Sequence, residues 1–222
     1  MRRHDLVYLD RDAAFETPCA ATGDSLWQAA RDWIAAGLPL VAARQPAGGG
    51  PILLGLSLPL KQQRKRLTIH VDRQAVAGIA APLAIARCCS RLPAAEADVL
   101  RRLAEQAAGC SASLGVFGSL AWEALSGEDY RHADSDIDLI CDVATLAQLD
   151  AMLAALQLAA GELRCRLDGE LRFPDGDAVA WREFAAHREN PAAQVLVKGP
   201  HEVGLRPVQS LLASLSEVCC HA

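Results

Sequence analysis

Apolar and polar positions in the first seventy residues follow two spacings, that of a helix and that of a strand. Apolar residues recur at helical spacing between Ser25 and Gly37, which predicts a helix that ends at the glycine. Short apolar runs follow at residues 39–43 and 52–58, and residues 67–71 alternate apolar and polar side chains. These segments are typical of strands joined by loops.

The rest of the chain continues this mixture of periods. Helical spacing starts again at Pro93, in residues 146–161 and after Pro207. Strands are expected at Ser113 to Phe117 and at residues 163–167, 170–173 and 178–184. Asp168-Gly169 is a turn signal between the first two strands of that last group.

The order of these elements predicts the fold class and the domain organisation. Because helices and strands do not alternate strictly, the pattern favours an α+β protein with a mixed sheet. The chain has 222 residues, enough for two small domains. We expect an amino-terminal α/β region at residues 1–90 and a larger domain at residues 91–222.

Composition and charge narrow the function classes. The net charge is −5 and aromatic residues make up 5% of the chain, so we expect no nucleic-acid partner. No apolar run approaches the roughly 18 residues of a membrane span, and the first residues do not form a signal peptide. We therefore expect a cytoplasmic protein without a membrane partner.

Eight cysteines are scattered along the chain, including the adjacent pairs Cys88-Cys89 and Cys219-Cys220. No C-x-x-C spacing occurs, which disfavours a zinc site. We expect these cysteines to be buried free thiols.

The most informative segment is an apolar strand that runs into Gly118-Ser119, followed sixteen residues later by Asp136-Ile137-Asp138. A glycine and a hydroxyl at the end of a strand allow a phosphate to approach backbone amides. On a returning strand Asp136 and Asp138 would share a face, where their carboxylates can hold Mg²⁺ or Mn²⁺. A D-x-D sequence is often only a solvated turn. Here it precedes the apolar Leu139, and carboxylates in an apolar strand are costly unless they bind something, so we predict a catalytic metal site.

This combination of motifs resembles the nucleotidyltransferase superfamily that includes DNA polymerase beta, and it implies a polymerase-beta-like catalytic domain. Over nearly its whole length the chain resembles one family in it, the malonate decarboxylase holo-acyl-carrier-protein synthases, or phosphoribosyl-dephospho-CoA transferases. Short segments carry this resemblance: Pro59-Leu60, Phe117-Gly118-Ser119-Leu120-Ala121-Trp122-Glu123, Ser135-Asp136-Ile137-Asp138-Leu139, Leu167-Asp168-Gly169-Glu170-Leu171, Ala180-Trp181-Arg182-Glu183 and Val195-Leu196-Val197-Lys198.

The family resemblance implies a reaction and two partners. The donor would be 2′-(5-triphosphoribosyl)-3′-dephospho-CoA, and the acceptor a serine of the acyl-carrier subunit of malonate decarboxylase, with diphosphate released. Residues 1–90 would then be an accessory domain for substrate or carrier.

Superfamily members use a third carboxylate on a later strand, for which Asp168, Glu170 and Glu183 are candidates. Asp168 is as well explained by a hairpin turn. Asp134 is either a partner of the catalytic pair or a loop residue.

Basic side chains are candidates for substrate binding. Lys61, Arg64 and Arg66 form a basic run before a predicted strand, and Lys198 follows another apolar stretch. Each would contact donor phosphates or an acidic carrier. The alternative for all four is a solvated surface.

Two other functions fit the same motifs. A nucleotidyltransferase that acts from ATP on a small molecule or a protein would use the same carboxylates. A non-catalytic nucleotide-binding module is disfavoured because Gly118, Ser119, Asp136 and Asp138 are all present.

Overall fold

The computed structural model describes residues 1–216 and divides the chain into two compact units. The amino-terminal unit consists of Met1–Pro82 and Trp122–Arg131, and the carboxy-terminal unit consists of Leu83–Ala121 and the chain from His132 onward. Both units combine helices with sheets, so the α+β prediction is confirmed. Within residues 1–216 no helix has the length and apolar character needed to cross a membrane.

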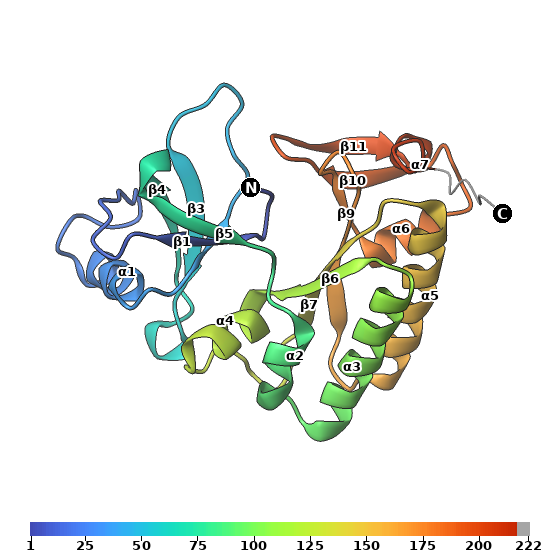
Figure 1. Cartoon of the computed structure of the whole chain (residues 1–222), viewed down its shortest axis with the longest axis horizontal. Helices are drawn as coiled ribbons and strands as arrows, with labels where there is room; N and C mark the ends of the chain where they lie inside the picture. The colour runs from blue at the N-terminus through green and yellow to red at the C-terminus, as the bar shows by residue number, and fades with distance from the viewer. Residues whose placement is uncertain (217–222) are drawn as a thin grey trace. The chain divides into compact units, whose positions relative to one another are not determined.

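The amino-terminal unit is built on an antiparallel five-stranded sheet in the order β4-β3-β2-β1-β5 (Figure 1). Its elements are β1 (Leu6–Leu9), α1 (Ser25–Ala35), β2 (Leu40–Ala42), β3 (Ile52–Ser57), β4 (Arg66–Val71), β5 (Val76–Ala80) and the 3-10 helices η1 (Leu60–Gln62) and η2 (Arg73–Ala75). The alternation in β3 and β4 turns Leu54 and Ile69 inward, and both are fully buried. Helix α1 adds Ile34 and Trp33 to this core.

The carboxy-terminal unit contains a mixed six-stranded sheet in the order β11-β10-β9-β8-β7-β6. Its elements are α2 (Ile85–Cys88), the 3-10 helix η3 (Cys89–Arg91), α3 (Ala94–Gly109), β6 (Ser113–Phe117), β7 (Ile137–Asp142), α5 (Leu146–Glu162), β8 (Leu167–Arg172), β9 (Ala178–Ala180), α6 (Trp181–His187), β10 (Gln194–Lys198), β11 (Val203–Pro207) and α7 (Val208–Leu212). Helix α4 (Gly118–Ser126) begins in this unit, directly after β6.

Strands β7 and β8 are the parallel pair of this sheet, and helix α5 connects them. Helices α3 and α5 pack against each other, and they contact β6 and β8 respectively (Figure 1). The Thr145 hydroxyl caps α5 by accepting a hydrogen bond from the Gln148 amide at 3.1 Å. The α5 crossover therefore brings the start of β8 beside the start of β7.

Three sequence predictions in this unit are wrong. No strand covers residues 163–166, and β8 begins only at Leu167. Asp168-Gly169 is not a hairpin turn but lies inside β8. A Cβ on Gly169 would stand 2.0 Å from the Leu139 carbonyl oxygen. A glycine is therefore needed here for β7 and β8 to approach each other closely. The strand predicted at residues 178–184 ends at Ala180, and helix α6 begins at Trp181.

Candidate active site

The junction of β6 and α4 is shaped around Asp138. Strand β6 ends at Phe117, which pairs with Asp138 of β7, and the chain turns into α4 at Gly118. Gly118 has φ +70°, and a Cβ there would lie 2.1 Å from Asp138 Oδ2. A residue with a side chain would therefore be strained and would displace the carboxylate. The predicted Gly-Ser segment and the predicted aspartate are thus brought together.

A second carboxylate lies beside Asp138. In the parallel register of β7 and β8, Asp138 is the partner of Asp168. Side chains of paired residues in a sheet project from the same face, so these two carboxylates are neighbours. Both are partly exposed, whereas Ile137, Leu139 and Leu167 next to them are buried. The third-carboxylate candidate Asp168 is therefore the cross-strand neighbour of Asp138 on this face of the sheet.

Asp136 lies one residue before β7 rather than within it. Its Oδ2 is 3.7 Å from Arg166 Nη1, and Arg166 Nη2 is 3.5 Å from Asp168 Oδ2. The sequence motifs did not predict a role for Arg166, because its contacts with both aspartates depend on the register of β7 and β8.

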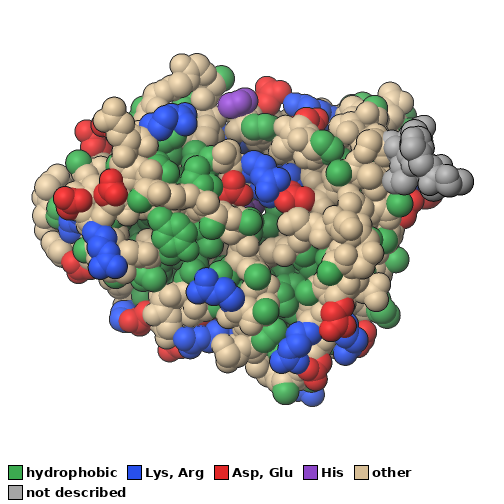
Figure 2. Space-filling view, in the orientation of Figure 1, with side chains coloured by type: hydrophobic (Ala, Val, Ile, Leu, Met, Phe, Trp, Pro, Cys, Tyr) green, Lys and Arg blue, Asp and Glu red, His purple; other side chains and the backbone are tan. Residues whose placement is uncertain are grey.

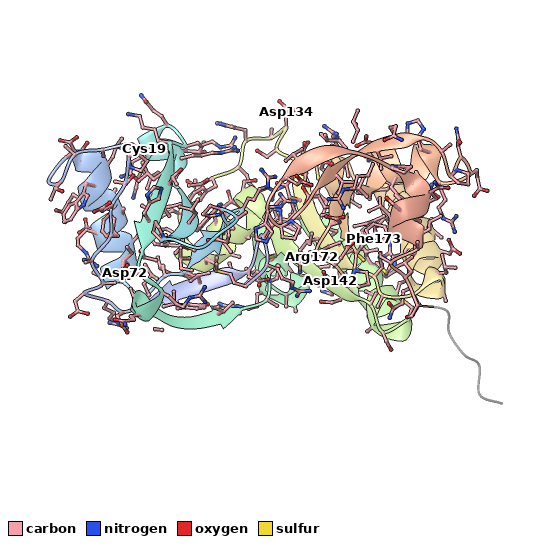
Figure 3. The ribbon with its side chains drawn as sticks, turned by 90° about the horizontal axis from the view of Figure 1, so that it is seen from above. Cys19, Asp72, Asp134, Asp142, Arg172 and Phe173 are labelled. Atoms are coloured by element: carbon pink, nitrogen blue, oxygen red, sulfur yellow. The ribbon has the colours of Figure 1, made fainter. Side chains whose placement is uncertain are left out.

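Asp134 lies on the loop that leads into β7. The His132 amide donates to Ser135 Oγ at 2.9 Å, and the Ser135 amide donates to the His132 carbonyl at 3.1 Å. These bonds close a turn with Asp134 exposed on it, as Figure 3 shows. This geometry agrees with the loop alternative for Asp134.

The other two candidates for a third carboxylate have different partners. Glu170 is 5% exposed, and its Oε1 accepts a hydrogen bond from Lys198 Nζ at 2.8 Å. Glu183 lies in α6 and accepts a hydrogen bond from the Leu196 amide at 2.8 Å. Lys198, at the end of β10, is thus held over the same sheet face as Asp168 and Glu170.

A further ion pair lies on the same face of the sheet, at the far ends of β7 and β8. Arg172 is 2% exposed and is hydrogen-bonded through Nη2 to Asp142 Oδ2 at 2.9 Å, with a second bond from Nε. The two residues are register partners in β7 and β8, and Figure 3 labels both. This pair, in which Arg172 is buried and Asp142 is partly exposed, ties the far ends of the two strands that carry Asp138 and Asp168.

The basic run belongs to the amino-terminal unit. Lys61 Nζ pairs with Glu128 Oε1 at 2.7 Å, while Arg64 and Arg66 are exposed. Arg64 has φ +52° and donates its amide to the Pro59 carbonyl at 3.2 Å, so the run occupies a defined turn. On the face drawn in Figure 2, basic and acidic side chains are interspersed.

Glu123 is a buried carboxylate to which no sequence motif assigned a role. Its Oε1 accepts the Tyr130 amide at 3.0 Å and the Arg131 amide at 2.7 Å. These two hydrogen bonds hold the segment that follows α4. Glu123 therefore has a structural role within the amino-terminal unit.

The six cysteines in the described part of the chain are all free, as predicted, but only Cys88 and Cys141 are buried. Burial raises the pKa of each of these two thiols to about 12. Cys19 is exposed, contrary to the prediction, and Cys219-Cys220 lies outside the described residues. The raised pKa of Cys141, in β7, makes it a poor nucleophile.

Comparison with known proteins identifies a family over both units. Residues 2–82 match the phosphoribosyl-dephospho-CoA transferase MdcG N-terminal domain, and residues 83–209 match the MdcG C-terminal domain. A phosphoribosyl-dephospho-CoA transferase of Xanthomonas axonopodis pv. citri is 37% identical, with 96% of this chain and 98% of the relative covered.

Two further relatives carry the same name. That of Xanthomonas euvesicatoria pv. vesicatoria is 36% identical over 94% of this chain and 95% of its own length. That of Bradyrhizobium diazoefficiens is 32% identical over 91% of this chain and 88% of its own length. No solved structure matches the chain significantly. The family models and these relatives together show that the chain belongs to the phosphoribosyl-dephospho-CoA transferase (MdcG) family.

Proposed function

We propose that this chain transfers phosphoribosyl-dephospho-CoA from 2′-(5-triphosphoribosyl)-3′-dephospho-CoA to a serine of the acyl-carrier subunit of malonate decarboxylase. The observation that carries the proposal is the match to both MdcG domains together with relatives of that name along nearly the full chain. The free thiols fit a reducing compartment such as the cytoplasm.

We further propose that the carboxy-terminal unit has the nucleotidyltransferase fold. The support is local: β6, Gly118 and α4 are followed by an antiparallel strand that bears Asp138, which is paired in parallel with a strand that bears Asp168. The mixed sheet with helices α3 and α5 is compatible with this assignment.

The residues fit a bound Mg²⁺ or Mn²⁺ if the substrate completes its coordination. Asp138 and Asp168, with Asp136 nearby, offer the oxygen ligands that these ions prefer. Within residues 1–216 no group of three Asp, Glu, His or Cys side chains is arranged to hold an ion alone. Mg²⁺ commonly takes one or two carboxylates plus substrate phosphates, which matches the pair found here. Such an ion, when bound, neutralises the triphosphate and the charge that develops during displacement.

The proposed reaction forms one bond and breaks one. The serine Oγ bonds to the α-phosphorus of the donor, and the bond from this phosphorus to the oxygen bridging the β-phosphate breaks. Diphosphate leaves with the electron pair, and an aspartate of the site accepts the serine proton. Gly118 leaves room for the Asp138 carboxylate, and the Ser119 hydroxyl and amide at the start of α4 are the proposed phosphate-binding groups.

Lys61, Arg64, Arg66 and Lys198 are proposed to bind the donor or the carrier. Lys198 stands over the sheet face of Asp168 through its bond to Glu170, and the other three belong to the amino-terminal unit. We propose that this unit, which contains most of residues 1–90, is the accessory domain for substrate or carrier.

Intact-mass spectrometry of the carrier tests the proposal. Apo-carrier incubated with the enzyme, Mg²⁺ and the triphosphoribosyl donor should gain the mass of phosphoribosyl-dephospho-CoA. Excess EDTA should prevent the gain, added Mg²⁺ or Mn²⁺ should restore it, and Zn²⁺ should not be needed. An unmodified carrier, together with efficient AMP transfer from ATP to a small molecule or protein, would favour the nucleotidyltransferase alternative instead.

A further inference from the structure

Arg166 is fixed between the two strands that carry the proposed catalytic aspartates. Its carbonyl accepts the Ile137 amide at 2.9 Å, which ties the residue before β8 to the first residue of β7. Its guanidinium lies 3.7 Å from Asp136 Oδ2 and 3.5 Å from Asp168 Oδ2. The backbone of Arg166 is therefore placed by the sheet, and its side chain spans two of the three neighbouring carboxylates.

These contacts are poorly suited to a structural role. Both distances exceed the 2.7–3.2 Å or so of a good N–H···O hydrogen bond. The Arg166 side chain is 58% exposed, and exposed ion pairs contribute little to stability. Arg172, by contrast, is buried and bonded twice to Asp142 in the same sheet. Arg166 is thus loosely held by carboxylates and open to solvent, a state in which it can change partners.

Two kinds of anion suit the Arg166 guanidinium, the carboxylates of the site and a triphosphate. Asp136, Asp138 and Asp168 bring three carboxylates to the start of two adjacent strands. In the free protein a nearby cation lowers their mutual repulsion. A triphosphate has oxygens that match the planar fork of an arginine, and such charge-assisted bonds are strong.

We propose that Arg166 exchanges partners during the catalytic cycle: it bridges Asp136 and Asp168 in the free protein and binds the triphosphate of the donor in the complex. The proposal rests on the proposed function in that the donor carries a triphosphate and the carboxylates bind a divalent cation. Arg166 is then a substrate-binding residue that also shields the carboxylates from solvent cations until the donor arrives.

This exchange has opposite consequences for two binding steps. Loss of the guanidinium charge removes a repulsion against a divalent cation, so Arg166→Gln should bind Mn²⁺ alone about three- to tenfold more tightly than wild type. The same variant loses charge-assisted bonds to phosphate, so it should bind preformed Mg²⁺–tripolyphosphate about tenfold or more weakly. A structural residue would weaken both steps, and an uninvolved surface arginine would change neither.

The experiment measures both affinities in the full-length protein without donor or carrier. Free Mn²⁺ is followed by electron paramagnetic resonance into the millimolar range, and Mg²⁺–tripolyphosphate binding is followed by calorimetry. Arg166→Lys keeps the charge but not the fork, so its Mn²⁺ affinity should equal wild type while its tripolyphosphate affinity is intermediate. Arg164→Gln is the matched control, because Arg164 is exposed, lies two residues earlier and carries the same charge. It should change both affinities by less than about twofold.

Tighter binding of Mn²⁺ together with weaker binding of Mg²⁺–tripolyphosphate in Arg166→Gln supports the proposal. Mn²⁺ binding that is measurable only in this variant also supports it. Equal or weaker Mn²⁺ binding in Arg166→Gln, no Mn²⁺ binding in either protein, or unchanged tripolyphosphate affinity overturns it. Neither probe contains dephospho-CoA or carrier. A wrong donor or acceptor in the proposed function would therefore appear in the mass spectrometry and leave this result unaffected.

Discussion

The carboxylate of Asp138 lies directly against the α-carbon of Gly118, so close that a Cβ on the glycine would stand 2.1 Å from Oδ2. This contact joins the two halves of the motif, the glycine at the end of β6 and the aspartate of β7. Gly118 cannot gain a side chain without moving the Asp138 carboxylate.

The first prediction therefore concerns Gly118→Ala. The added methyl group must displace Asp138, and φ +70° is unfavourable for alanine, so carrier modification should fall by at least about 100-fold. Initial rates by mass spectrometry measure the effect. Gly48→Ala is the control, because Gly48 also has positive φ but an added Cβ there would meet no atom within 4 Å. Equal rates in the two variants would mean that the Gly118–Asp138 contact is unimportant.

The basic run should affect binding rather than chemistry. In Lys61→Ala/Arg64→Ala/Arg66→Ala, the KM for donor or carrier should rise about three- to tenfold, while kcat stays near wild type. Steady-state kinetics at two salt concentrations measure this, since screening should reduce the difference between variant and wild type. Both KM values at the wild-type level would assign these side chains to a solvated surface.

The Asp142–Arg172 pair should be important for stability. Arg172→Met leaves the Asp142 carboxylate without its buried partner, and we expect the free energy of unfolding to fall by about 2–4 kcal/mol. Urea denaturation measures the change. Arg101→Met breaks an exposed pair with Asp98 and should cost less than about 0.5 kcal/mol. Similar losses in the two variants would contradict the importance of burial.

The buried thiols predict a pH dependence. Burial raises the pKa of Cys88 and Cys141 from 9.0 to about 12, so above pH 9 the unfolded chain releases protons that the folded chain retains. Their contribution to stability is complete below pH 9 and is lost progressively as the pH rises toward 12. The double variant Cys88→Ala/Cys141→Ala should lose less stability than wild type between pH 9 and pH 12, and thermal melts at several pH values measure this.

The same burial predicts the order of thiol labelling. Iodoacetamide at pH 8 should label exposed Cys19 well before Cys88 or Cys141, as followed by peptide mapping. Earlier labelling of a buried thiol would contradict this.

Much of the candidate active site follows from local sequence. The end of β6, the Gly118-Ser119 junction and Asp138 in β7 lie where the apolar pattern predicts them, whereas Asp136 precedes the strand expected to contain it. Each depends on residues close together in the chain, so the pattern carries the information.

The errors arise where distant strands decide the outcome. Asp168-Gly169 has the composition of a turn, but Gly169 is required by the close approach of Leu139 in the neighbouring strand. The apolar run after Ala178 fits the spacing of a strand as well as that of a helix, and the chain becomes helical at Trp181. Arg166 meets Asp136 and Asp168 only through the parallel register, which no local pattern contains.

The most direct test of the account is the rate of carrier modification by Asp138→Asn and Asp168→Asn, measured together with thermal melts. Both side chains are partly exposed, so the near-isosteric amides should leave the melting temperature within a few degrees of wild type. Because each variant removes a proposed metal ligand, the rate should fall by about 1,000-fold or more. Near-wild-type rates in correctly folded Asp138→Asn and Asp168→Asn would contradict the assignment of the active site to these carboxylates.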